Sequence, residues 1–155
     1  MTPVLESKLP QVGTTIFTVM SALAQESQAV NLGQGFPDFD CDPKLIDAVT
    51  DAMRRGQNQY PSMLGVPELR QAIAHKVQTL YGRSYDPVSE ITVTAGATQA
   101  IINAVLAVVR PGDEVIVPAP YWVSYPEMVK LAGAVPRFVL ADDKTGFRLT
   151  PAMVL

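Results

Sequence analysis

The residues with the clearest chemical potential lie in the stretch Ile91–Ile102, which reads ITVTAGATQAII. The pattern predicts a short apolar strand over Ile91–Thr94, a turn of small residues, and an apolar helix over Thr98–Val109. The small side chain of Ala97 leaves backbone N–H groups uncovered, and Thr98 offers both a helix cap and a hydroxyl group. Such a helix N-terminus binds anions such as phosphate, although the same residues also fit a plain connection between strand and helix.

Three further positions could hold other parts of a ligand. Trp122 follows the expected strand Val115–Val117, and carboxyl ends of parallel strands share one crevice. Its indole therefore suits either stacking on a flat ring or ordinary core packing. Tyr60 is a loop phenol that could donate to a phosphate or simply pack. Gly35 ends a GQG turn in which a backbone N–H could approach a small carboxylate.

Other catalytic chemistries find no support in the sequence. No CxxC, HExxH or spaced carboxylate cluster predicts a metal site. The single histidine, His75, falls off the apolar stripe of a helix expected to begin at Pro67, so we expect it to face solvent. No Ser-His-Asp set can be assembled around it.

Composition narrows the class of protein. The chain has 155 residues, 48% of them apolar, and a net charge of −3, which suit a globular domain and not a nucleic-acid-binding surface. One cysteine, Cys41, excludes an internal disulfide and fits a reducing compartment. No apolar run is long enough to span a membrane, and no secretion signal is visible. We therefore predict a cytoplasmic protein.

The remaining pattern predicts an α/β fold. Helices are expected over Thr14–Gln25, from Pro43 onward, from Pro67 onward, and over Tyr121–Leu131 after an irregular start. Asp42 is expected to cap the helix that begins at Pro43. A third apolar strand is expected over Val135–Leu140. Alternating strands and helices indicate a parallel sheet covered on both faces. Thr150 and Pro151 predict the start of a helix, but the sequence stops at Leu155 after about one turn. We therefore expect the chain to be truncated there.

Several motifs together resemble one enzyme family. NLGQGFPDF, NQY with a glycine five residues on, ITVTAGATQA and PGDEVIVPAPYWVSYPEM resemble, in order and spacing, the class I/II aminotransferases. These are fold-type I enzymes that use pyridoxal 5′-phosphate. The resemblance implies the truncated N-terminal part of that fold, a mainly parallel sheet flanked by helices. Residues 1–42 would form the N-terminal arm and the first segment of the small domain, and residues 43–155 the first part of the large cofactor-binding domain.

The resemblance also implies roles for cofactor-binding residues. Ala97 and Thr98 would hold the cofactor phosphate of their own subunit. Trp122 would stack on the pyridine ring. Tyr60 would reach across a homodimer interface to the phosphate of the other subunit.

The same resemblance places two residues at the substrate and none at the proton-transfer step. Gly35 would offer its N–H to the substrate α-carboxylate, and Phe17 would line the substrate pocket. The family's Schiff-base lysine would lie beyond residue 155, so the chain would contain no catalytic residue of that kind. None of the lysines present stands in a matching position: Lys8, Lys44, Lys76, Lys130 and Lys144.

The implied function is transfer of an amino group from an amino acid to a 2-oxo acid. The chain would be an N-terminal fragment of such an enzyme, and the isolated fragment is expected to be inactive. Two alternatives remain open: a carbon–sulfur lyase of the same fold, and a non-catalytic domain that binds a phosphate ligand. Residues up to about Ala100 resemble the methionine and kynurenine aminotransferase branch, whereas PYWVSYPEMVKLAG resembles the aspartate branch. The amino-acid substrate is therefore left open.

Overall fold

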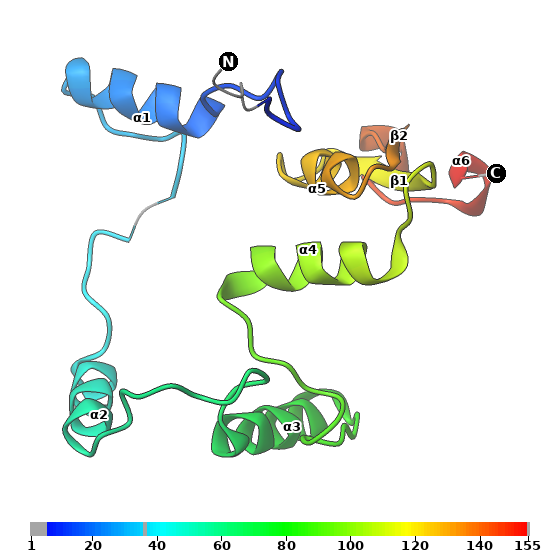
Figure 1. The fold of residues 1–155 in the computed structure, drawn as a ribbon. Helices are drawn as coiled ribbons and strands as arrows, with labels where there is room; N and C mark the ends of the chain where they lie inside the picture. The colour runs from blue at the N-terminus through cyan, green and yellow to red at the C-terminus, as the bar shows by residue number, and fades with distance from the viewer. Residues whose placement is uncertain (1–5, 36, 155) are drawn as a thin grey trace, which may run out of the picture. The chain divides into compact units, whose positions relative to one another are not determined.

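A computed structural model describes residues 6–35 and 37–154 (Figure 1). Contacts within the chain divide it into two units. One unit comprises residues 12–91, and the other comprises residues 92–154 together with residues 6–11. Among the described residues, no helix has the length and apolar character that crossing a membrane would require.

The unit of residues 12–91 is helical: α1 (Ile16–Glu26), α2 (Pro43–Arg54) and α3 (Pro67–Tyr81). Asp42 caps α2, since its Oδ1 accepts a hydrogen bond from the Lys44 N–H at 2.8 Å. Pro67 is the first residue of α3, and Gly82 ends that helix in the left-handed conformation. The helix starts predicted at Pro43 and Pro67, and the cap predicted at Asp42, are confirmed.

A buried arginine ties α3 to the segment that follows it. Arg70 is 8% exposed, and its Nη1 donates to the Val88 carbonyl at 3.1 Å. That segment is folded around Asp86, whose carboxylate accepts hydrogen bonds from the Ser89 hydroxyl at 2.5 Å and the Val88 N–H at 3.0 Å. These two donors, led by Ser89, hold the pKa of Asp86 below its ordinary value of 3.8.

The second unit is built on a β–α–β motif. Its elements are α4 (Gly96–Val108), β1 (Glu114–Ala119), α5 (Tyr125–Leu131), β2 (Val135–Leu140), the 3₁₀ helix η1 (Asp143–Thr145) and α6 (Pro151–Val154). β1 and β2 pair in parallel, from Glu114 opposite Val135 to Ala119 opposite Leu140. α5 packs against both strands, and Val117, Val129 and Ala134 form the core between them.

Side chains alternate along the two strands in the usual way. Val115 and Val117 point toward α5, and Ile116 points to the opposite side of β1. The expectation of a sheet covered on both faces is therefore met on one face, because Ile116 is 43% exposed. Across the strands, the Arg137 Nε donates to Glu114 Oε1 at 2.8 Å, and this guanidinium holds the pKa of Glu114 below its ordinary 4.5.

The turns that enter the two strands are bonded to each other. The Gly112 N–H donates to the Gly133 carbonyl at 2.9 Å, and the Val135 N–H donates to the Asp113 carbonyl at 2.8 Å. Gly133 has a φ of +78°, and a Cβ at this position would lie 3.2 Å from the Cβ of Pro111. Glycine is therefore required at position 133 both by its backbone conformation and by the nearby proline ring.

One predicted strand is wrong. Residues 91–94 form no strand in the structure, and the sheet of the described residues contains only β1 and β2. An apolar, β-branched run favours extended backbone, but a strand also needs a neighbour to pair with, and none of the described residues supplies one here. The strand Val135–Leu140 is confirmed, and the strand predicted over Val115–Val117 extends to Glu114–Ala119.

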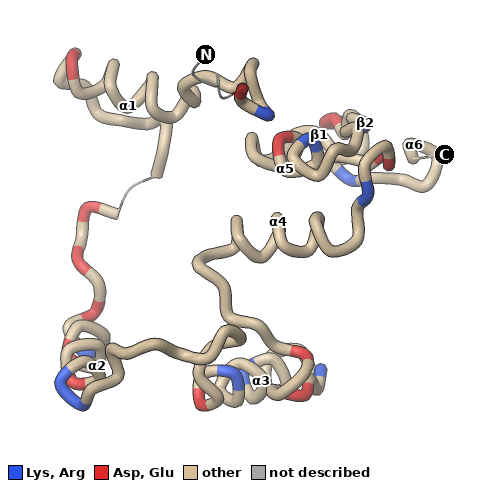
Figure 2. Tube along the Cα trace, viewed as in Figure 1, with Lys and Arg blue, Asp and Glu red and all other residues tan. Residues whose placement is uncertain are grey.

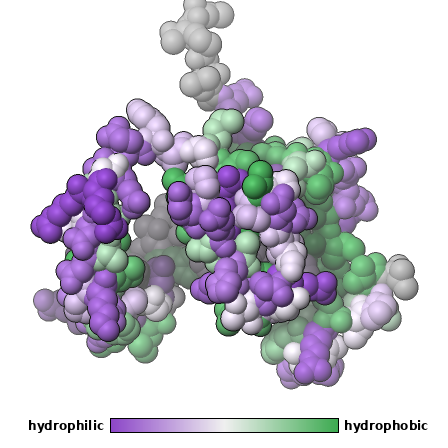
Figure 3. Space-filling view, turned by 90° about the horizontal axis from the view of Figure 1, so that it is seen from below, coloured by the Kyte–Doolittle hydropathy of each residue, from purple (hydrophilic) through white to green (hydrophobic). Residues whose placement is uncertain are grey.

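Many large apolar side chains remain exposed in both units. Figure 3 shows green hydrophobic atoms lying at the surface beside purple hydrophilic ones. On α1, the side chains of Ile16, Val19 and Leu23 are about half exposed. The apolar periodicity that predicts helices 14–25 and 43–54 therefore identified the helices without locating a buried core.

Candidate functional site

The N-terminus of α4 differs in detail from the predicted anion site. The helix begins at Gly96, two residues earlier than expected, and its N-cap is Ala95, which makes no side-chain capping bond. The prediction that Thr98 caps the helix is wrong, because Thr98 already lies in the first turn. Gly96 has a φ of +83°, a conformation that glycine adopts without strain.

Two polar side chains that the sequence analysis did not single out organise this turn. Gln99 Oε1 accepts a hydrogen bond from the Ala95 N–H at 2.5 Å, and the Thr94 hydroxyl donates to the Gly96 carbonyl at 3.0 Å. A glutamine reaching back from the first turn to the cap resembles a capping box. Its position just after the small-residue turn is the signal that could have identified Gln99.

The first turn of α4 has the donors that an anion requires. Ala97 and Thr98 are exposed, and the first N–H groups of any helix have no partner inside it. α4 is tan along its whole length in Figure 2, so the helix itself carries no charged side chain that would oppose or reinforce its dipole. Backbone N–H groups together with the Thr98 hydroxyl form a donor set that fits a phosphate group.

Trp122 lies in the loop between β1 and α5, in the same unit as the α4 turn. Trp122 is 50% exposed and is not part of the core formed by Val117, Val129 and Ala134. The Trp122 carbonyl accepts a hydrogen bond from the Tyr125 N–H at 3.0 Å, which leads the chain into α5. An indole that is fixed through its backbone and half exposed fits stacking on a flat ring.

The other three candidates, Phe17, Gly35 and Tyr60, belong to the helical unit. Phe17 is half-buried on α1 and lines a shallow hollow together with Gln34, the residue before Gly35. Gly35 itself does not line this hollow. Tyr60 is fully exposed in the loop before α3, so the alternative that it packs within this chain is not met among the described residues.

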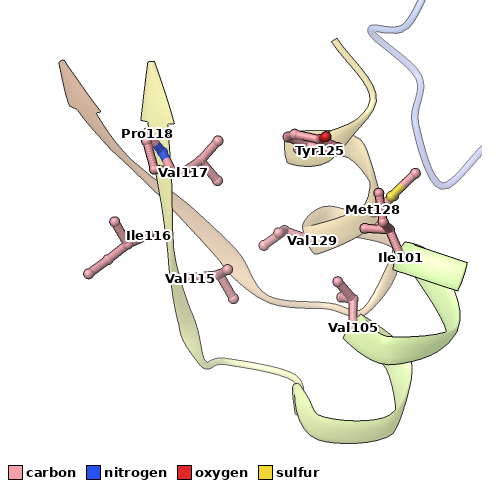
Figure 4. A pocket seen from close by; sticks show the side chains of 9 residues that line it. All are labelled: Ile101, Val105, Val115, Ile116, Val117, Pro118, Tyr125, Met128 and Val129. Atoms are coloured by element: carbon pink, nitrogen blue, oxygen red, sulfur yellow. The ribbon is translucent and has the colours of Figure 1, made fainter. Parts of the chain in front are cut away.

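An apolar cavity of the second unit lies apart from the candidate site residues. It has a volume of about 350 Å³ and lies among α4, β1 and α5 (Figure 4). Ile101 and Val105 of α4 face Val129 of α5 and the side chains of β1 across it. No charged residue lines this cavity, so it suits neither a phosphate nor an amino acid, and it represents incompletely filled core.

Comparison with known proteins decides the family. Residues 27–154 match the family of class I and II aminotransferases. The chain belongs to this family. Over 130 residues it is 54% identical to the methionine aminotransferase of Escherichia coli, an alignment that covers 84% of this chain and 34% of that protein.

Solved structures of other members share the fold of this aminotransferase-family chain. A structure described as a methionine aminotransferase from Escherichia coli has a TM-score of 0.89 and 49% identity, covering 96% of this chain and 38% of that chain. N-succinyldiaminopimelate aminotransferase from Mycobacterium tuberculosis has a TM-score of 0.88 and 45% identity, covering 97% and 40%. The predicted α/β, fold-type I architecture is confirmed. The chain spans about a third of the length of these relatives.

Proposed function

We propose that this chain supplies the phosphate-binding side of a pyridoxal-phosphate-dependent aminotransferase, which transfers an amino group from an amino acid to a 2-oxo acid. The observation that carries the proposal is the first turn of α4, where Ala97 and Thr98 are exposed at the positive end of an uncharged helix. Family membership makes pyridoxal phosphate the anion that this turn would bind. When bound, this cofactor supplies an electron sink that acidifies the α-proton of the amino acid.

The residues of this chain would bind and orient the reactants. The N–H groups of Ala97 and Thr98, with the Thr98 hydroxyl, would hold the phosphate. The half-exposed indole of Trp122 would cover one face of the ring and exclude water from it. Gly35 would hold the substrate carboxylate through its N–H, and the ring of Phe17 would form an apolar wall beside it.

The proton-transfer step would not be performed by this chain. None of its lysines stands where the family carries the cofactor-binding lysine, and proton transfer at the substrate α-carbon needs an amine of that kind. We therefore expect the 155-residue chain to bind cofactor without producing glutamate from an amino acid and 2-oxoglutarate. Glutamate formation above a control without protein would contradict this expectation.

We further propose a homodimer that acts in the reducing cytoplasm, where the exposed thiol of Cys41 would persist. The fully exposed Tyr60 would then donate its hydroxyl to the phosphate bound by the partner subunit. Replacing Tyr60 by Phe in the intact dimer should weaken cofactor binding without changing the dimer mass measured by light scattering. Unchanged cofactor affinity would remove Tyr60 from the site.

The central test compares two ligands that differ only in the phosphate. Binding of pyridoxal phosphate and of pyridoxal is measured by equilibrium dialysis for the unaltered protein and for Thr98→Val. Because hydrogen bonds to charged groups are worth about 1.5–3 kcal/mol, we expect Thr98→Val to weaken pyridoxal phosphate binding about tenfold or more. Pyridoxal binding should not change, and Thr150→Val, distant in sequence, should alter neither. Equal affinity of the Thr98 variant and the unaltered protein for pyridoxal phosphate would contradict the assignment.

A second assay separates transfer from cleavage in the complete protein. Amino transfer to 2-oxoglutarate without release of ammonia is the expected result. Release of pyruvate and ammonia from cystathionine would instead indicate a carbon–sulfur lyase.

A further inference from the structure

The rings of Tyr121 and Phe138 are stacked, although the two residues lie on different sides of α5 in the sequence. Their centroids are 5.2 Å apart, and the ring planes meet at 23°. Tyr121 directly precedes Trp122 in the loop after β1, whereas Phe138 belongs to β2. An aromatic contact at this distance and angle is attractive and restricts both rings.

The backbone of Phe138 is fixed by its pairing with β1, so its ring can support the ring of Tyr121. Phe138 is in register with Val117, so both side chains leave the same face of the sheet. Val117 is 3% exposed and packs against Val129 of α5 within the core. The Tyr121 ring therefore rests on the strand that adjoins the best-packed part of this unit.

The chain just after Trp122 is also fixed. The Tyr125 N–H donates to the Trp122 carbonyl, and α5 then buries Met128 and Val129. Trp122 thus stands between two anchors, an aromatic stack on its N-terminal side and a buried helix on its C-terminal side. Its own side chain remains half exposed between them.

We propose that Tyr121, stacked on Phe138, is a positioning residue that fixes the indole of Trp122 for the cofactor ring. The proposal rests on the proposed cofactor role of Trp122. Tyr121 and Phe138 are themselves 38% and 54% exposed, so their contact buries little apolar surface. Its main effect is on the direction of the loop and not on the stability of the fold.

Trp122 is the only tryptophan of the 155 residues, so its fluorescence reports on this loop alone. The experiment measures the fluorescence anisotropy of Trp122 in the chain without ligand and the dissociation constant for pyridoxal phosphate. Three variants are compared with the unaltered chain: Tyr121→Ala, which removes the ring; Tyr121→Phe, which keeps it; and Tyr81→Ala, a matched loss of an exposed tyrosine at the end of α3.

We expect Tyr121→Ala to lower the anisotropy of Trp122 and to raise the dissociation constant about two- to tenfold, the range that a lost aromatic contact allows. Tyr121→Phe should restore both values, since the stack needs the ring and not the hydroxyl. Tyr81→Ala should change neither. If Tyr121→Ala leaves the anisotropy of Trp122 unchanged, the positioning role is wrong.

A variant on β2 tests the same contact without changing the sequence of the loop. Phe138→Leu keeps an apolar side chain on β2 but removes the stacking surface, and it should reproduce both effects of Tyr121→Ala. The two substitutions combined should be no worse than either alone, because each removes the same contact. Additive effects would contradict the proposal.

Failure of the proposed function would look different. If the unaltered chain and Trp122→Ala bound pyridoxal phosphate equally well, the cofactor role of Trp122 would be wrong. The anisotropy of the ligand-free Tyr121 variants would still measure whether the stack holds the tryptophan.

Discussion

The helical unit and the β1–α5–β2 motif bury their residues in different ways. In the described part of residues 12–91, Arg70 is the one residue that is buried, and the apolar faces of α1 and α2 are exposed. The motif of β1, α5 and β2 buries Val117, Met128, Val129 and Ala134. Short-range signals are sufficient to form each helix, whereas burial requires segments that are distant in sequence to pack together.

The candidate site residues are also divided between the two units. Trp122 belongs to the motif that has its own core, and the turn at Ala97 and Thr98 belongs to the same unit. Phe17, Gly35 and Tyr60 belong to the helical unit, in which Arg70 is the one buried residue among those that the structure describes. We therefore expect the position of Trp122 to depend on the tertiary packing of the motif, and the positions of Phe17, Gly35 and Tyr60 to depend on local structure.

The largest effect is expected in the core of the motif. Met128 is 4% exposed, and Met128→Ala should destabilise β1 and β2 by about 2–5 kcal/mol, because it leaves a cavity. Hydrogen exchange of the β1 and β2 amides measures this loss. Leu23→Ala on α1, where the side chain is 51% exposed, should leave those amides unchanged. Equal losses from both substitutions would remove the contrast between the two units.

A smaller effect is expected from the buried arginine of the helical unit. Arg70→Ala leaves the Val88 carbonyl without its donor, and it should destabilise α3 and the segment after it by about 1–3 kcal/mol. Amide exchange in α3 measures this effect. Arg54→Ala is the control, since its 3.9 Å pair with Asp51 is exposed and should contribute little. An effect larger than that of Met128→Ala would show that the helical unit has the stronger core.

The cap of α2 tests whether a helix of this chain is stabilised mainly by residues close to it in sequence. Asp42→Ala removes the acceptor of the Lys44 N–H and should cost about 1 kcal/mol of helix stability. Backbone chemical shifts of α2 report this loss. Asp47→Ala, in the middle of the same helix, should have no such cost because alanine favours helix. If shifts in β1 also moved, the helix would not be locally determined.

The smallest effect concerns two exposed carboxylates, one in each unit. Asp86 and Glu114 both have a pKa below the ordinary value, so each contributes stability that is present above that value and lost as the pH falls through its folded pKa. The lowered pKa of Glu114 depends first on the hydrogen bond from Arg137 and then on the charge of that guanidinium, whereas the lowered pKa of Asp86 depends first on the neutral hydroxyl of Ser89. Salt should therefore raise the pKa of Glu114 toward 4.5 and leave that of Asp86 nearly unchanged.

Carboxyl NMR titrations at low and high salt measure both values. Asp86→Asn and Glu114→Gln assign the two resonances. Equal salt sensitivity of the two carboxylates would show that Asp86 is governed by charge as well.

How far the sequence predicts this protein depends on the range of each interaction. The starts of α2 and α3 were predictable because Asp42, Pro43 and Pro67 act within one helical turn. The strand at residues 91–94 was not, because a strand is defined by a partner and the apolar run says nothing about where one lies. The same limit applies to the candidate site: ITVTAGATQA predicts Ala97 and Thr98 as phosphate-binding residues, but no local pattern links Tyr121 to Phe138 across α5.

The turns before β1 and β2 are hydrogen-bonded to each other. We therefore expect the end of the sheet where the strands begin to tolerate fewer substitutions than the end where they finish. Where the strands begin, the positive φ of Gly133 and the nearby ring of Pro111 favour glycine at position 133. The Gly133 carbonyl also accepts a hydrogen bond from the Gly112 N–H. The residues that would meet the cofactor instead follow the end of β1. A mutagenesis library directed at the cofactor-binding loop should therefore randomise the residues around Trp122 and keep Pro111, Gly112 and Gly133 constant. Deep mutational scanning should show more tolerated substitutions in the loop after β1 than at Pro111, Gly112 and Gly133.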